Sequence, residues 1–237
     1  MRARDRRTRI RRLCTEGELE TVFQPMIELD SDQPVAYEAL TRFPSQTRST
    51  RECFADATEL GVGPDLELAA VRSALGYLDA FPSDTRLSIN VSPGVAVTDE
   101  FFDLVAPVAE RLIIELTEHE PVEDYDALSE ALSHLRTMGA LIAIDDVGAG
   151  FATLRHIIRL APDILKLDLS LTQTVERDSS SRALTSALID FGGSTGTLIA
   201  AEGIETQAEL DLLRELGVDQ GQGYFLGRPE RLMALIQ

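Results

Sequence analysis

The sequence predicts an α/β protein with a single domain, built as a closed (β/α)8 barrel. Three observations lead to this fold class. Short apolar segments alternate with amphipathic segments along the chain, which is typical of a mostly parallel sheet covered by helices. The apolar segments repeatedly finish in an acid, an amide or a lysine. The chain of 237 residues is also long enough for one such barrel.

The individual elements follow from composition and periodicity. The segments that read as strands are apolar and bounded by polar residues or glycines. They are residues 21–29, 35–43, 86–92, 111–118, 141–148, 163–170, 197–203 and 223–227. Most stretches between them have apolar residues three and four positions apart and read as amphipathic helices that end at a glycine. The clearest of these are residues 124–139 and 181–193.

Polar residues at the strand ends favour a closed barrel over an open sheet. In an open sheet the ligand crevice is local, so strands far from it have no reason to end in acids. A closed barrel brings all the strand ends to one rim, where such residues converge. The residues at these positions are Asn90, Glu115 with Glu118, Asp145 with Asp146, Lys166, Glu202 and Gln222.

The composition argues against several classes of function. A formal charge of -18 repels the phosphates of nucleic-acid polymers. No apolar run approaches the roughly 18 residues that cross a bilayer, and the start of the chain lacks the apolar region of a signal peptide. We therefore expect a soluble protein with no transmembrane segment. Cys14 and Cys53 have neither metal-site nor disulfide spacing, which favours a reducing, cytoplasmic setting.

Residues 1–12 form a basic arm with seven arginines and one aspartate. The arm is either a solvated helix or linker, or a contact for acidic lipid headgroups or a partner. We expect the folded domain to occupy residues 13–237. No second sensory domain fits in the chain, so regulation is expected from partners, from self-association or from an upstream domain of a longer protein.

The adjacent acids Asp145 and Asp146 suggest a cation site, although a helix cap or a turn is the alternative explanation of such a pair. Neighbouring side chains on a strand point to opposite faces. The two acids can therefore share a site only if the strand stops there and Asp146 begins the loop. The other candidate ligands are Glu38, Asn90, Glu115 and Glu202. Burying so many anions requires a counter-charge.

Oxygen ligands without cysteine or histidine suit Mg²⁺ or Mn²⁺, and the number of acids allows two ions. Two such ions form the standard arrangement for in-line attack on phosphorus. On the strand at 35–43, Glu38, Leu40 and Arg42 share one face, so a guanidinium could reach a phosphate in the same cavity. An exposed ion pair explains that spacing about as well.

Lys166 is the only lysine in the chain, beside 21 arginines. An ammonium is a compact charge that holds one water or one phosphate oxygen, whereas a guanidinium is broad and planar. We predict that Lys166 lies between metals and substrate, at a place where an arginine does not fit. The alternative is that one residual lysine falls there by chance.

These residues resemble the EAL domain, a family of bacterial cyclic di-GMP phosphodiesterases. The motifs that carry the resemblance stand in order as FQPMIEL, YEALTRF, LSINVSP, IIELTE, IAIDDVGAGFATL, PDILKLD, IAAEGIET and GQGYFLGRP. The resemblance implies a modified TIM (β/α)8 barrel that cuts one phosphodiester of cyclic di-GMP to give linear pGpG. This reaction would lower the second messenger in bacterial signalling.

The resemblance also implies roles for single residues. The ligands of a first Mg²⁺ or Mn²⁺ would be Glu38, Asn90, Glu115 and Asp145, with Asp145 bridging to a second ion held by Asp146 and Glu202. Lys166 would contact the attacking water, and Gln222 would complete the polar network around it. Arg42 would contact a substrate phosphate, while Gln24 and Leu40 would face the dinucleotide.

Two further acids are interpreted through the same resemblance. Glu118 is similar to the acid that anchors the loop after the double aspartate and couples it to a dimer interface. We therefore expect a homodimer and count Glu118 with Lys166, Glu202 and Gln222 among the catalytic residues. Glu205 is expected to be structural, as a cap at the start of a helix.

The loop after the double aspartate departs from the family pattern. The family loop usually reads DDFGTGYSSL, whereas this chain has DDVGAGFATL, with Val147, Ala149 and Ala152 replacing an aromatic residue, a threonine and a serine. This loss of a ring and of hydroxyls leaves open a catalytically weak or inactive module that binds cyclic di-GMP or a protein partner as a sensor. A Mg²⁺ barrel acting on another phosphorylated or enolisable substrate fits the acids but not the full series of motifs.

Overall fold

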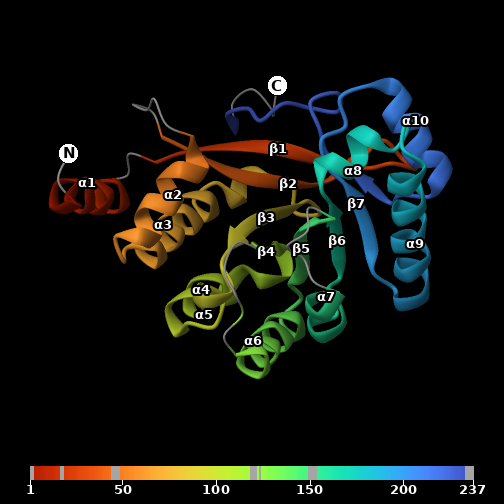
Figure 1. The fold of residues 1–237 in the computed structure, drawn as a ribbon. Helices are drawn as coiled ribbons and strands as arrows, with labels where there is room; N and C mark the ends of the chain where they lie inside the picture. The colour runs from red at the N-terminus through yellow and green to blue at the C-terminus, as the bar shows by residue number, and fades with distance from the viewer. Residues whose placement is uncertain are drawn as a thin grey trace.

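The fold is a closed barrel, as predicted. The computed structural model describes residues 3–16, 19–43, 49–117, 122, 124–148 and 154–232. Within these residues the strands close in chain order from β1 to β8 (Figure 1). They are β1 (Glu20–Glu28), β2 (Gln33–Arg42), β3 (Arg86–Val91), β4 (Leu112–Leu116), β5 (Leu141–Val147), β6 (Ile164–Leu167), β7 (Leu198–Ala201) and β8 (Gln220–Gly221).

Strand β1 runs antiparallel to both of its neighbours, β2 and β8. The remaining neighbouring pairs, from β2–β3 to β7–β8, are parallel. Only residues 29–32 separate β1 from β2, and Asp32 adopts a left-handed φ of 58° in that turn. A connection this short joins antiparallel strands, because a parallel pair needs a crossover of about a dozen residues.

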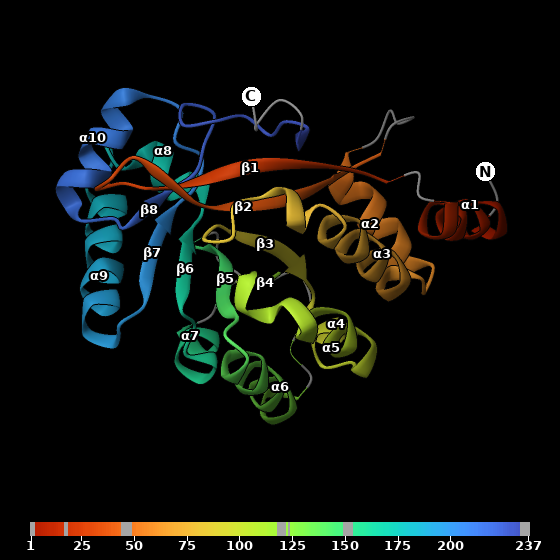
Figure 2. The same cartoon turned by 180° about the vertical axis from the view of Figure 1, so that it is seen from behind.

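Helices lie outside the ring of strands when the molecule is seen from both sides (Figure 2). They are α1 (Ala3–Glu16), α2 (Thr50–Glu59), α3 (Gly63–Leu75), α4 (Pro93–Ala96), α5 (Asp99–Val105), α6 (Tyr125–Thr137), α7 (Leu154–Leu160), α8 (Leu169–Thr174), α9 (Ser179–Thr195) and α10 (Gln207–Leu216), with 3-10 turns at Leu78–Ala80 and Ala106–Arg111. None of the described helices is both long and apolar enough to span a membrane.

Helix α9 continues past the glycines where the sequence predicts its end. It ends at Gly196, which has the left-handed φ of 77° that closes many helices. A Cβ atom on Gly192 would lie 2.5 Å from the carbonyl oxygen of Thr197. Gly192 therefore allows close packing between the helix and the following chain, and it does not end the helix.

The barrel interior contains an apolar layer with a polar layer beside it. The apolar layer is formed by Met26, Ala36, Ile113, Ala143, Ile164 and Ala200. Residues two positions apart on a strand share a face. Each of these positions therefore has a partner on the same face two residues away: Gln24, Glu38, Glu115, Asp145, Lys166 and Glu202. Glu115, Asp145, Lys166 and Glu202 thus lie near the carboxyl ends of parallel strands. Gln24 and Glu38 join them from within β1 and β2.

The last strand lies at Gln220–Gly221, and not at residues 223–227 as the sequence predicts. Gly221 pairs with Ile27 of β1 and Ala201 of β7. The next residues form a turn, in which the backbone N–H of Gly227 donates to the carbonyl of Gly223 at 2.9 Å. Tyr224 and Phe225 are exposed in this turn, so their apolar character does not mark a buried strand.

The described part of the basic arm, residues 3–12, is helical, and its apolar edge is packed. Ile10 and Leu13 of α1 are buried in a cluster with Cys53 and other residues of α2 and α3. The Arg6 guanidinium lies 3.2 Å from the Asp56 carboxylate of α2. The predicted boundary after residue 12 therefore falls inside a continuous helix.

Candidate active site

Lys166 lies at the centre of the polar layer, with 1% of its side chain exposed. Its Nζ atom is 2.6 Å from Glu202 Oε1 and 2.8 Å from Glu115 Oε2. Asp145 Oδ1 and Glu38 Oε2 lie at 3.4 and 3.6 Å. Burial by itself lowers the pKa of Lys166, but these carboxylates together raise it well above its usual value. The ammonium is therefore charged at neutral pH.

The two carboxylates nearest to Lys166 bind protons more tightly than ordinary glutamates. The pKa of Glu115 is raised to about 8, mainly by burial and in addition by the charges of Glu38 and Asp145, while the ammonium of Lys166 acts in the opposite direction. Burial also raises the pKa of Glu202 well above its usual value. This site therefore contains more negative charge than one ammonium compensates.

Glu38 is oriented by amide groups on both of its oxygens. Asn90 Nδ2 donates to Oε1 at 2.9 Å, and Gln222 Nε2 donates to Oε2 at 2.7 Å. Gln222 Nε2 also approaches Gln24 Oε1 at 3.0 Å, and Gln24 Nε2 donates to the carbonyl of Gly227 at 2.9 Å. The amides of β3 and of the segment after β8 thus hold the acid of β2, and the amide of β1 supports Gln222.

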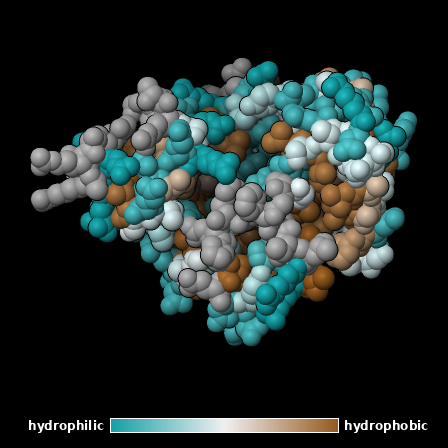
Figure 3. Space-filling view, viewed as in Figure 1, coloured by the Kyte–Doolittle hydropathy of each residue, from teal (hydrophilic) through white to brown (hydrophobic). Residues whose placement is uncertain are grey.

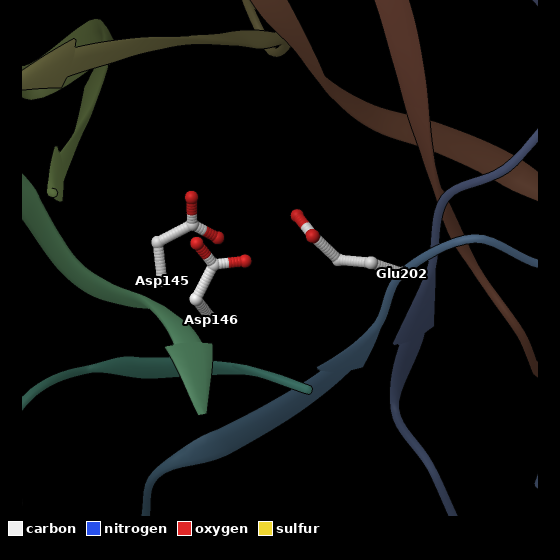
Figure 4. A group of neighbouring side chains, drawn as sticks. All are labelled: Asp145, Asp146 and Glu202. Atoms are coloured by element: carbon white, nitrogen blue, oxygen red, sulfur yellow. The ribbon is translucent and has the colours of Figure 1, made fainter. Parts of the chain in front are cut away.

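A bulge in β5 brings Asp145 and Asp146 to the same site. The pairing register between β5 and β6 shifts between Ile144 and Val147, and Asp146 has a left-handed φ of 54°. The sequence predicts that the two acids share a site only if the strand stops at Asp145 and Asp146 begins the loop, which is wrong, because β5 continues to Val147. The extra residue of a bulge changes which face the following side chain occupies. The two carboxylates therefore lie side by side and face Glu202 (Figure 4).

The donor set fits a divalent cation. Asp145, Asp146 and Glu202 each place a carboxylate oxygen within 4.8 Å of the others. Asp145 Oδ1 is buried and accepts no hydrogen bond, although Lys166 lies 3.4 Å away. Hard oxygen donors without sulfur or imidazole are the ligands that Mg²⁺ and Mn²⁺ prefer.

A cavity of about 790 Å³ opens beside this polar cluster. Leu40 and Arg42 of β2 line it together with Asn90 and Asp146. The guanidinium of Arg42 donates to the carbonyl of Thr41 at 3.0 Å. Glu38 lies in the polar cluster, whereas Leu40 and Arg42, on the same face of β2, line the cavity. This face of β2 therefore connects the polar cluster to the cavity wall. The volume lies within the range of roughly 300–1,000 Å³ typical of small-molecule sites.

Sequence reasoning missed the outer wall of the cavity. Arg51 and Phe54 of α2 and Glu67 of α3 line it. These residues lie on helices, where charged and apolar side chains also occur for ordinary solvation and packing. Their placement near the site depends on how α2 and α3 dock against β2 and β3, for which the local sequence gives no signal.

Three of the sequence expectations concern residues that the structure does not describe, Glu118, Ala149 and Ala152. Val147 is described and buried, and it pairs with Leu167 of β6. Glu205 is not the cap of α10. That role belongs to Thr206, whose hydroxyl accepts from the backbone N–H of Glu209 while the Glu209 carboxylate accepts from the backbone of Thr206.

Comparison with known proteins identifies the family of this fold and site. The sequence pattern of the EAL domain matches residues 7–229. The bifunctional diguanylate cyclase/cyclic di-GMP phosphodiesterase MucR of Pseudomonas aeruginosa is 30% identical over 244 residues, which cover 96% of this chain and 36% of MucR. The chain spans about a third of the length of the curated relatives that it matches.

Two solved structures show the same fold. The PaMucR phosphodiesterase in complex with c-di-GMP is 27% identical, with a TM-score of 0.81 over 98% of this chain and 99% of that one. BlrP1 of Klebsiella pneumoniae, in a manganese/cy-diGMP complex, is 28% identical, with a TM-score of 0.77 over 90% of this chain and 56% of that one. The order of the strands, the ring of acids at their ends and these matches agree, and the chain belongs to the EAL domain family.

Proposed function

We propose that this chain is a metal-dependent phosphodiesterase that hydrolyses cyclic di-GMP to linear 5'-pGpG. The observation that carries the proposal is the cluster of Glu38, Glu115, Asp145 and Glu202 around Lys166, which lies next to a cavity large enough for a small ligand. The relatives support the same substrate, because MucR is named as a cyclic di-GMP phosphodiesterase and its structure contains c-di-GMP.

The acids and Asn90 would hold two ions, Mg²⁺ or Mn²⁺. Glu38, Asn90, Glu115 and Asp145 are proposed as ligands of the first ion, and Asp145, Asp146 and Glu202 of the second. When bound, such ions lower the pKa of a water molecule and neutralise the charge that develops on the phosphate. A manganese complex of the relative BlrP1 and the oxygen donors of this cluster support the choice of metal.

Lys166 and Gln222 would orient the attacking water. The ammonium of Lys166 is held from several sides by carboxylates, so its N–H groups point in fixed directions. Gln222 is fixed by Glu38 and Gln24, and its Oε1 atom is buried without a hydrogen-bond partner. That free acceptor could receive a hydrogen bond from a water, which fits its proposed place in the polar network.

Arg42 and Leu40 would bind the dinucleotide from the cavity wall. The Arg42 guanidinium donates to the carbonyl of Thr41 and also interacts with the charge of Glu20 on the neighbouring strand. A guanidinium has five N–H donors, and we propose that those facing the cavity bind a phosphate. Gln24 is buried and engaged by Gln222 and Gly227. We propose that Gln24 contributes by supporting Gln222, in addition to the predicted contact with the substrate.

The proposal includes a homodimer that acts in the cytoplasm. Apolar residues gather on one face of the molecule over α8 and α9, where Leu169 and Leu184 are exposed (Figure 3). Exposed apolar patches often mark sites of association. Glu118 is proposed to couple the loop after the double aspartate to the dimer interface.

An assay of product formation tests the proposed activity. The purified chain is expected to convert cyclic di-GMP to pGpG with Mg²⁺ or Mn²⁺, and Glu38→Ala or Asp145→Ala should abolish turnover, because each removes a proposed ligand. Unimpaired turnover in either variant would contradict the ligand assignment. If the unmodified chain binds cyclic di-GMP but forms no product with either metal, the alternative function applies, in which the chain is an inactive module that senses cyclic di-GMP.

A further inference from the structure

Ser88 of β3 is a polar residue in the otherwise apolar layer of the barrel. It is two residues before Asn90 and shares its face, and it pairs in register with Glu38 of β2 and Ile113 of β4. The positions of β2, β4, β5, β6 and β7 in this layer are occupied by alanine or isoleucine. Ser88 is 0% exposed, so its hydroxyl is shielded from bulk solvent.

The hydroxyl is directed at one carboxylate of the polar cluster. Ser88 Oγ donates to Glu115 Oε1 at 2.5 Å. The carbonyl of Ile113 is also near, at 3.4 Å. A serine hydroxyl has a single proton to donate, and the carboxylate oxygen at the shorter distance is the better placed of the two acceptors. The contact with Glu115 therefore dominates.

Ser88 and Lys166 together hold Glu115 at both ends of its carboxylate. Lys166 Nζ donates to Oε2 at 2.8 Å, and Glu115 is 0% exposed. A carboxylate held by one donor can rotate about its last torsion, whereas one held on both oxygens has a fixed plane. Because the group is buried, bulk solvent does not reach it to replace a lost donor.

We propose that Ser88 is a positioning residue that fixes the carboxylate of Glu115 in the orientation needed for metal binding. This inference rests on the proposed function, in which Glu115 is a ligand of the first ion. Outer partners of metal-binding carboxylates orient them, and their loss typically costs about 10–100-fold in metal affinity or activity. The small volume of Ser88 could instead serve packing alone, and an alanine would serve that purpose equally well.

The test compares Ser88→Ala with a matched control in the same barrel. Thr197→Val removes a buried hydroxyl that donates to the carbonyl of Pro162 at 3.0 Å, at the opposite end of the strands, and keeps the shape of the side chain. Affinity for Mn²⁺ alone is measured from the signal of free Mn²⁺ in electron paramagnetic resonance, without substrate. The thermal midpoint of each metal-free variant is measured alongside.

We expect Ser88→Ala to weaken Mn²⁺ binding about 10–100-fold, while Thr197→Val leaves it unchanged. Ser88→Thr, which retains the hydroxyl, should recover most of the affinity. In turnover assays Ser88→Ala should lower kcat more than it changes KM, since Ser88 does not line the cavity.

Equal Mn²⁺ affinity in Ser88→Ala and the unmodified chain would overturn the inference, and so would an equal loss in Ser88→Ala and Thr197→Val. If Ser88→Thr unfolds, the comparison of Ser88→Ala with Thr197→Val decides alone. The proposed function fails separately, through an absence of Mn²⁺ binding or of pGpG formation in the unmodified chain.

Discussion

At the scale of single residues, Lys166 shows why one lysine persists in an arginine-rich chain. Its ammonium contacts carboxylates on several sides within 2.6 to 3.6 Å and is almost completely buried. A compact ammonium with three donors fits such a space, whereas a planar guanidinium needs room for a fork of five donors. A steric reason for lysine at this position is therefore a prediction that a substitution can test.

Lys166→Arg keeps the charge and tests this reason. We expect hydrolysis to slow by about 100-fold or more, because the larger group displaces the carboxylates and a shift of about 1 Å in a reacting group has that effect. The measurement is kcat for pGpG formation. Arg72→Lys at the exposed pair with Glu100 is the control and should leave kcat unchanged. Near-normal rates in Lys166→Arg would mean that the position tolerates either cation.

The raised pKa of Glu115 predicts how the metal-free protein responds to pH. With a pKa of about 8 in the folded state against an ordinary 4.5, Glu115 binds a proton in the folded chain that the unfolded chain has released. Stability is therefore expected to fall as pH rises from about 5 to about 8, by up to about 1.4 kcal/mol per pH unit for each such group. Glu202 shifts in the same direction.

The measurement for this prediction is the thermal midpoint in a chelator across that pH range. Glu115→Gln should flatten the profile, because glutamine does not titrate. Added Mn²⁺ should reverse the slope, since metal binding favours deprotonated ligands. A metal-free profile that rises with pH in the unmodified chain would show that Glu115 is ionised throughout the range.

At the scale of the elements, the alternation of side chains along each strand builds the site. Ala36 and Glu38, Ile113 and Glu115, and Ile164 and Lys166 repeat one arrangement of an apolar residue followed by a polar one on the same face. Strand β5 breaks the alternation with its bulge, which adds a second acid to the site. The bulge requires a residue that tolerates a left-handed backbone, and aspartate and asparagine are the usual non-glycine choices.

Two substitutions at Asp146 separate the effect of its left-handed backbone on stability from the effect of its carboxylate on metal binding. Asp146→Asn and Asp146→Ala both remove the carboxylate, so both should weaken Mn²⁺ binding. Alanine is less stable in the left-handed region, and Asp146→Ala should unfold more easily than Asp146→Asn by about 1 kcal/mol. Urea denaturation of the metal-free variants gives this difference. Equal stabilities would indicate that the bulge relaxes in the variants.

At the scale of the whole molecule, closure of the barrel depends on the reversed first strand and the segment after the last. β1 pairs with β2 on one side and with β8 on the other. Phe23 of β1 also exchanges backbone hydrogen bonds with Glu230, at 2.7 and 3.0 Å. The segment that joins β8 to this contact contains Gly223, next to Gln222 of the polar network. The segment after β8 therefore helps to close the barrel and also supplies Gln222 to the polar cluster.

Gly223→Ala is expected to destabilise the barrel by about 3 kcal/mol, because overpacking against a rigid neighbour costs this much. An added Cβ would lie 2.2 Å from the backbone nitrogen and oxygen of Ile204. Chemical denaturation measures the effect. The control is Gly193→Ala in α9, where an added Cβ would meet no neighbouring group within 4 Å. This substitution should stabilise the folded chain by about 0.5–1 kcal/mol. A neutral Gly223→Ala would show that this segment moves freely.

The local pattern of the sequence was sufficient for the barrel and for most of the polar cluster. Apolar segments that end in a polar residue predict the strands, because this pattern can be recognised within a short stretch of sequence. The order of the strands in the barrel then follows their order along the chain. Lys166 and the acids around it were found in this way. The same pattern predicts the last strand at residues 223–227, which is wrong, because Tyr224 and Phe225 have a strand-like composition but lie exposed in a turn.

Other features depend on contacts between residues far apart in the chain. The bulge at Asp146, the cavity wall formed by Phe54 and the hydrogen bond from Ser88 to Glu115 each arise when separate elements meet. Serine and phenylalanine occur in many strands and helices for packing reasons alone, so their types do not reveal these roles. The sequence by itself specified which chemistry the chain carries, and the packing of the barrel set the distances and orientations at which its groups meet.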